Sequence, residues 1–178
     1  QQTMKKVLLI ALCFAIPMAG FAQKKKKKGA EPEVVAPVVE TLSDEECMVN
    51  LSLFHESVKN KQYADAYEPW WSVYSTCPNA NKIIYTDGAK IVEALYKATT
   101  DEAEKERLAK LAVEMQDKRI RFFGNDPKYP TAYILGEKGM AYLDFYGNTK
   151  LAEAHDCLQK SVAGMGAQSK IMTLVKLV

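Results

Sequence analysis

Apolar residues recur at intervals of three and four along this 178-residue chain from about residue 43 onward, which is the spacing of one face of an α-helix. No stretch alternates polar and apolar residues over the length of a strand. Glycine and proline fall between the apolar stretches, where they end helices and begin turns. The pattern predicts an all-α body of six helices, over about 43–60, 63–76, 81–98, 102–123, 131–145 and 149–163.

Several helix ends carry their own signals. Ser43 followed by Glu46 is a capping box, and Asp101 lies in a second N-terminal capping sequence. Pro78 ends the second predicted helix, because the residue before a proline leaves the helical region. Pro69 lies inside that helix, where we expect a kink or a new turn. The apolar residues of 167–178 predict the start of a further or capping helix.

Six helices joined by short turns, at about 40 residues a pair, are typical of a helical-repeat solenoid. The apolar stripe of the first predicted helix contains Leu51, Phe54 and Val58. The first pair resembles a tetratricopeptide repeat at Leu53, Ala66, Trp70, Val73 and Pro78. It departs from that family's usual aromatic, small and tyrosine positions at Asn50, Phe54 and Ser57. The third pair matches that family at Gly139, Tyr142, Ala154, Leu158 and Ser161, with about three extra residues between its helices. The second pair matches at Gly88 and Ala112 and departs from the pattern at Gln116 and Arg119. The resemblance implies a right-handed solenoid of about three antiparallel helix pairs over residues 43–166.

The N-terminal residues predict export. Lys5 and Lys6 precede the apolar run 7–18, and small residues follow at the positions that a signal peptidase reads. The run is shorter than the roughly 20 residues of a transmembrane helix. We therefore interpret residues 1–22 as a signal peptide with a leading remnant. We expect a protein secreted across the inner membrane, and thus periplasmic or associated with the cell envelope.

Residues 23–42 form a lysine-rich and then Pro-, Ala- and Val-rich segment that predicts a disordered linker. The run Lys24 to Lys28 is either a peripheral contact with an anionic membrane or wall surface or simply a solvated charge run. Once this run, Lys5 and Lys6 are set aside, 17 basic residues remain against 22 acidic ones. A mildly acidic body is not expected to bind nucleic acid.

Cys47 and Cys77 fall at the same end of the first predicted helix pair, since one opens its first helix and the other closes its second. An oxidising compartment would let them form a disulfide. The alternative is two buried free thiols. Cys157 lies on an apolar stripe, which favours a small core residue over a reactive thiol.

Motifs of catalysis and of cofactor binding are lacking. His55 and His155 have no ligand partners at helical spacing, and no phosphate loop, dinucleotide fingerprint or serine elbow occurs. We therefore expect no enzyme activity, no cofactor and no metal. The third and weakest interpretation is a hydrolytic enzyme with one catalytic glutamate in a deep pocket, chosen from Glu56, Glu68 and Glu93.

The resemblance also indicates a binding surface, because the first helix of each tetratricopeptide pair lines the concave face. The expected groove residues are His55, Lys59, Lys82, Tyr85, Glu93, Tyr133, Met140 and Asp144. Their mixed charge suits a peptide segment, so the first hypothesis is an exported scaffold that binds another envelope protein. The alternative is a module that binds a glycan or cell-wall fragment through Trp71, which we expect to be partly exposed, and neighbouring tyrosines.

Overall fold

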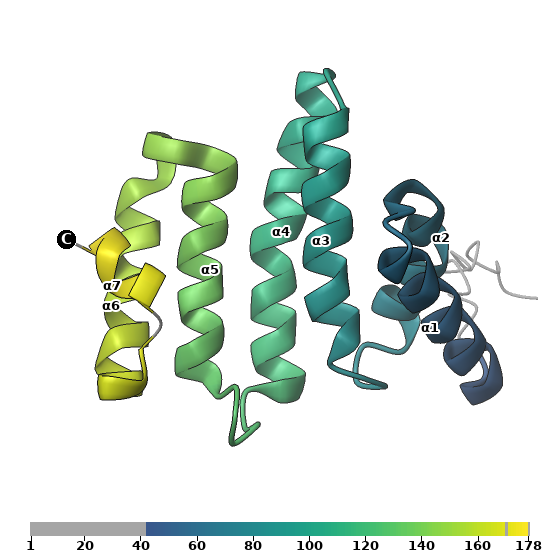
Figure 1. Ribbon diagram of the computed structural model, residues 1–178, viewed down its shortest axis with the longest axis horizontal. Helices are drawn as coiled ribbons and strands as arrows, with labels where there is room; N and C mark the ends of the chain where they lie inside the picture. The colour runs from purple at the N-terminus through teal and green to yellow at the C-terminus, as the bar shows by residue number, and fades with distance from the viewer. Residues whose placement is uncertain (1–41, 170, 178) are drawn as a thin grey trace, which may run out of the picture. The chain divides into compact units, whose positions relative to one another are not determined.

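The computed structural model describes residues 42–169 and 171–177 (Figure 1). The predicted signal peptide and the lysine run lie outside the described residues. Within them the chain is all-α, as predicted, with no strand. The helices are α1 (Asp44–Lys59), α2 (Tyr63–Thr76), α3 (Ile83–Ala98), α4 (Glu102–Phe123), α5 (Thr131–Tyr146), α6 (Leu151–Met165) and α7 (Ile171–Leu177), with short 3-10 turns η1 (Gly147–Lys150) and η2 (Gly166–Gln168).

The local signals act as the sequence predicts. The backbone N–H of Glu46 donates to the Ser43 hydroxyl, and the Glu46 carboxylate accepts from the Ser43 backbone at 2.8 Å, which completes the capping box. Asp101 accepts the N–H groups at the start of α4. Pro69 starts no new helix, because α2 continues through it to Thr76. Leu42, the last residue assigned to the linker, already packs against the core.

Each helix packs against its neighbours in sequence, from α1 on α2 to α6 on α7. α1 also contacts α3, and α4 packs against both α3 and α5, between which it lies in Figure 1. Packed antiparallel pairs of this kind are compatible with a helical-repeat fold. No helix among residues 42–169 and 171–177 is both long and apolar enough to cross a membrane.

Trp70 is the largest fully buried side chain of the core, and it joins α2 to α3. Its indole N–H donates to the Ile84 carbonyl oxygen at 2.7 Å. A Cβ at Gly88 would lie 2.5 Å from the same indole nitrogen, so only glycine permits this approach. Gly139 plays the same part between α5 and α6, where a Cβ would lie 2.7 Å from Leu158. The small positions expected at Gly88 and Gly139 are thus confirmed.

Leu53, which matches the large position of the repeat pattern, is 53% exposed. Phe54, the next residue, is fully buried. The buried stripe of α1 also contains Leu51 and Val58, at the spacing that the apolar pattern predicts. A large side chain at position 54 therefore rotates α1 so that Leu53 faces outward.

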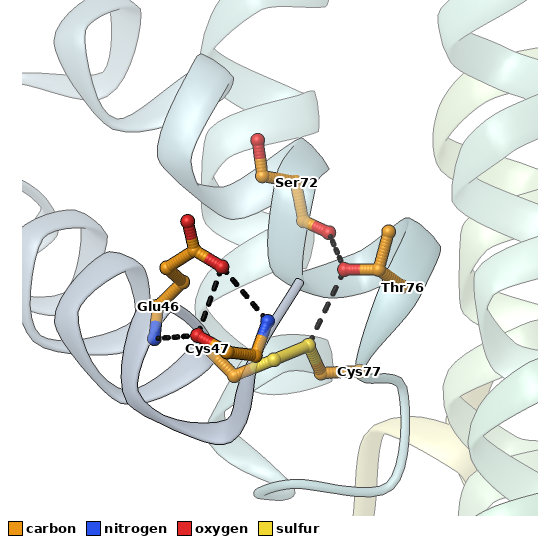
Figure 2. Close-up of a disulfide and its surroundings, with 6 residues drawn as sticks. Glu46, Cys47, Ser72, Thr76 and Cys77 are labelled. Carbon is orange, nitrogen blue, oxygen red and sulfur yellow. Dashed lines mark hydrogen bonds between the residues drawn. A yellow bond between two sulfur atoms is a disulfide. The ribbon is translucent and has the colours of Figure 1, made fainter. Parts of the chain in front are cut away.

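Cys47 and Cys77 lie at the same end of the first helix pair, as predicted, and are placed as a disulfide (Figure 2). Their Cα atoms are 6.3 Å apart, within the usual range for a disulfide. The Thr76 hydroxyl donates to the Ser72 carbonyl oxygen at 2.7 Å and lies 3.3 Å from the Cys77 sulfur. Cys157 is a buried free cysteine, and burial raises the pKa of its thiol. The first helix pair is thus cross-linked at one end by two cysteines that are 30 residues apart.

Candidate binding groove

Two adjoining pockets lie between α3 and α5, with α4 as their floor. The first, here called the basic pocket, has a volume of about 350 Å³ and is lined by Asn81, Lys82, Ile83, Thr86, Arg119, Tyr129, Tyr133 and Glu137. The second, the acidic pocket, has a volume of about 180 Å³ and is lined by Ala89, Glu93, Ala112, Met115, Gln116, Glu137, Met140, Ala141, Asp144 and Phe145. Glu137 lines both pockets, which together form one groove.

Contacts at each end of α3 fix the groove. At one end the Tyr96 ring packs edge-on against Phe145, and the Tyr96 hydroxyl donates to the Phe145 carbonyl oxygen at 3.2 Å. At the other end the Lys82 ammonium lies 2.8 Å from Asp126 and over the Tyr129 ring. Lys82 also belongs to the turn before α3, where Asn81 accepts the Ile83 backbone N–H. One end of α3 therefore contacts α5, and the other end contacts the turn that precedes α5. The space between these two contacts forms the groove.

Arg119 is the buried basic side chain of the basic pocket. It comes from α4 and is only 5% exposed. Burial lowers the pKa of its guanidinium below the ordinary value, and the charges of Glu137 and Asp126 oppose that shift. A guanidinium offers five N–H donors and no acceptor. Together with Lys82 and the rings of Tyr129 and Tyr133, Arg119 suits an acidic or aromatic group.

The acidic pocket combines carboxylates at its rim with a buried amide at its floor. Glu93 and Asp144 are exposed at the rim, whereas Gln116 on α4 is only 4% exposed. Although Asp144 is exposed as a residue, its carboxyl is partly withdrawn from water, which raises its pKa, and the charge of Glu93 raises it further. Among the described residues, the Gln116 Oε1 is the one buried side-chain polar atom without a hydrogen-bond partner.

The structure brings five of the eight expected groove residues together. Lys82 and Tyr133 line the basic pocket, and Glu93, Met140 and Asp144 line the acidic pocket. The remaining three, His55, Lys59 and Tyr85, lie elsewhere.

His55 faces α3 rather than the groove. Its Nδ1 lies 2.7 Å from the buried carboxylate of Asp87, which also pairs with Lys90 at 2.8 Å. Lys59 pairs with Glu56 on the surface of α1. His55 and Lys59 therefore do not line the groove with the other expected residues.

The expectation that Tyr85 lines the groove is wrong, because the structure buries this residue completely. Its hydroxyl donates to the Pro78 carbonyl oxygen at 2.9 Å, and its ring packs between Tyr74 and Phe123. Burial raises the pKa of this hydroxyl above its ordinary range. Tyr85 is therefore a core residue that positions the start of α3 and does not contact a ligand.

Sequence reasoning missed the floor of the groove. Gln116 and Arg119 were visible only as polar residues at positions where the second pair departs from the repeat pattern. Such departures on a buried helix face are the signal that could have found them, because a buried polar group is costly unless it has a partner. Tyr129 and Glu137 carried no comparable signal.

Trp71 is 38% exposed, as expected, and belongs to an aromatic surface on α2. Its ring stacks on Tyr67 with centroids 6.2 Å apart. Arg107 of α4 donates to the Tyr67 hydroxyl at 3.1 Å. This surface is the structural basis of the alternative, glycan-binding interpretation.

A further apolar surface lies on the outward face of α1. Met48, Val49 and Leu53 are each more than half exposed there and line a shallow depression. Nothing in the structure shows what covers this face.

The three glutamates of the catalytic interpretation lie among the described residues. Glu56, Glu68 and Glu93 are all exposed. Glu56 pairs with Lys59, which lowers the pKa of that carboxyl, whereas a general acid would need a raised pKa. Within the part of the chain that the structure describes, no three His, Cys, Asp or Glu side chains converge as a metal site.

Comparisons with protein-family models, with curated proteins and with solved structures found no match to this chain. The class that the described residues define is therefore an all-α protein of packed helix pairs, with a two-part groove between α3 and α5.

Proposed function

We propose that this protein is an exported, non-enzymatic helical-repeat scaffold of tetratricopeptide type, which binds a segment of another envelope protein in the groove between α3 and α5. The observation that carries the proposal is the groove itself, which gathers Lys82, Glu93, Tyr133, Met140 and Asp144 from α3, the turn before it and α5. Concave sites with a few buried polar groups are the usual form of a binding site.

The dimensions of the groove favour a peptide segment over a small metabolite. Residues 83–96 of α3 span about 20 Å at about 1.5 Å a residue. An extended segment of about six residues has the same length. The groove also presents cations at one end and carboxylates at the other, which suits a chain with different side chains along its length.

Export is supported by the signal-like N-terminal pattern and by the paired cysteines. Disulfides persist in oxidising compartments such as the periplasm and are rare in the cytosol. The placement of Cys47 and Cys77 as a pair therefore agrees with an envelope location. In this proposal the linker sets the distance between the scaffold and the membrane or wall.

A second candidate function is the binding of a glycan or cell-wall fragment. It is favoured by the stacked, partly exposed Trp71 and Tyr67. Aromatic faces of this kind offer a large apolar area with a polar edge. Loss of glycan binding on Trp71→Ala, with groove variants unaffected, would support this candidate against the first.

The test of the first function is capture of partners from solubilised envelope by residues 23–178. The groove-filling variant carries Thr86→Trp and Met140→Trp, which place bulk in the basic and acidic pockets. The matched control is Lys110→Trp, at an exposed position of α4. We expect mass spectrometry to identify a protein that the native chain and the control retain and that the groove-filling variant loses. Capture of the same proteins by all three would overturn the groove assignment.

A further inference from the structure

The acidic pocket is built almost entirely from hydrogen-bond acceptors and apolar groups. Each polar side chain that lines it carries an acceptor oxygen, namely the carboxylates of Glu93, Glu137 and Asp144 and the amide of Gln116. The Gln116 Oε1 is buried and has no donor among the described residues. A polar group that enters this pocket therefore finds the most partners if it carries hydrogen-bond donors.

Nearby basic residues only partly neutralise these carboxylates. Lys97 pairs with Glu93, and the charge of Arg119 acts on Glu137 from the floor. No described basic side chain lies within ion-pair distance of Asp144, and Lys97 and Lys176 act on it only from farther away. Asp144 is thus the carboxylate with the most to gain from a new cation.

The remaining lining residues suit the stem of a long basic side chain. Ala89, Met115, Met140 and Phe145 present apolar atoms around the same space. Lysine and arginine lay their methylene stems along apolar surface while the charged head reaches polar partners. The volume of about 180 Å³ accommodates one such side chain and excludes a folded element.

We propose that the acidic pocket receives the ammonium or guanidinium group of a lysine or arginine side chain carried by the bound segment. The inference rests on the proposed function, since it names a residue that the partner contributes to the same groove. Lysine and arginine heads carry only donors, which match the carboxylates of Glu93 and Asp144 and the open acceptor of Gln116.

The arrangement also sets the direction of the segment. Residues 137–144 of α5 span about 10 Å at about 1.5 Å a residue, which separates the acidic rim from the Arg119 pocket. A basic side chain at the Asp144 end would therefore lie about three extended residues from whatever contacts Arg119. A segment bound in reverse would set its basic residue against Arg119 and Lys82.

The experiment is an NMR titration of residues 23–178 with acetylated, amidated pentapeptides of the form Ala-Ala-X-Ala-Ala. X is arginine, lysine, citrulline or norleucine. Citrulline keeps the shape of arginine without its charge, and norleucine keeps the stem alone. We expect the arginine and lysine peptides to shift the backbone amides of α3 and α5 around Glu93 and Asp144, and the two neutral peptides to bind at least tenfold more weakly.

Two variants locate the interaction. Asp144→Asn removes the charge at an exposed position, and we expect it to weaken binding of the arginine peptide by about tenfold. The matched control, Asp156→Asn, removes one charge at an exposed position of α6 and should leave binding unchanged. Amide spectra of each free variant confirm that its fold is intact.

Equal binding of the citrulline and arginine peptides, an unchanged affinity of Asp144→Asn, or no shifts in the groove would each overturn the inference. Failure of the inference is distinguishable from failure of the scaffold function. If the native chain still captures an envelope protein that the Thr86→Trp, Met140→Trp variant loses, the groove binds a partner without a basic anchor. If that capture also fails, both proposals fall.

Discussion

Leu53 and Phe54 are adjacent residues with opposite environments, and they show how one side chain sets the rotation of a helix. Leu53 matches the repeat pattern yet is 53% exposed, whereas Phe54 departs from it and is fully buried. Phe54 fills a position that the family usually gives to a small residue. The apolar stripe of α1, with Leu51, Phe54 and Val58, is buried as its helical spacing predicts.

The two residues should therefore differ sharply in their contribution to stability. We expect Phe54→Ala to lower the free energy of unfolding by about 3–5 kcal/mol, because it removes a buried ring and leaves a cavity. Leu53→Ala should change it by no more than about 0.5 kcal/mol, as at other exposed sites. Urea denaturation of both variants is the measurement. A cost at Leu53 equal to that at Phe54 would mean that the Leu53 side chain is buried in the folded chain.

Gly88 is a second single residue with a large effect, because it permits the close contact between α3 and Trp70. We expect Gly88→Ala to destabilise the fold by about 1–3 kcal/mol, as overpacking does in other cores, because its Cβ would lie 2.5 Å from the indole nitrogen. This loss would come in spite of the better helix propensity of alanine. Thermal unfolding followed by tryptophan fluorescence measures it. A gain in stability would mean that α2 and α3 separate at little cost.

Asp144 makes stability depend on pH with a definite sign. Its folded pKa is raised by burial and by Glu93, so ionisation of this carboxyl favours the unfolded chain. Asp144→Asn should therefore be at least as stable as the native chain at neutral pH. The difference should vanish as the pH falls below the ordinary aspartate pKa of about 3.9, where both states are protonated. Urea denaturation over that pH range tests this, and a less stable variant at neutral pH would contradict it.

At the scale of elements, the cysteine pair joins the start of α1 to the end of α2. The bond closes a loop of 30 residues, which in the chain-entropy model contributes about 3–4 kcal/mol to the free energy of unfolding. We expect the double variant Cys47→Ser, Cys77→Ser to lose about that amount, and reducing agent to have the same effect on the native chain. Cys157→Ser is the control, since that thiol has no disulfide partner. Denaturation with and without reductant gives the comparison, and identical curves would show that the pair is not bonded.

Helix positions could be predicted from the sequence because their signals are local. The capping box at Ser43, the proline at position 78 and the cap at Asp101 each act within one helical turn. The contacts between helices were less predictable. Tyr85 was expected at the groove from its place in the first helix of a pair, but its burial depends on Pro78 and Phe123, which meet it only in the folded chain.

At the scale of the described body, residues 42–177 without residue 170, the contacts between α1 and α3 differ from those between α3 and α5. His55 and Asp87 bind α1 to α3, so the first pair is closed against the second. Between α3 and the chain around α5, Tyr96 contacts Phe145 and Lys82 contacts Asp126, and the groove opens between these two contacts. A sequence pattern that treats every repeat alike predicts one groove along all first helices. The difference between the two junctions arises from particular side chains.

The contacts at the two ends of the groove restrict how a partner can enter it. Tyr96 with Phe145 stands at one end, and Lys82 with Asp126 and Tyr129 stands at the other. A segment that fills the groove between these contacts meets a side-chain contact at each end, so its flanking residues would leave the groove there rather than continue along α3. A bowed loop in the middle of a folded protein has this shape, and it needs no free terminus to bind.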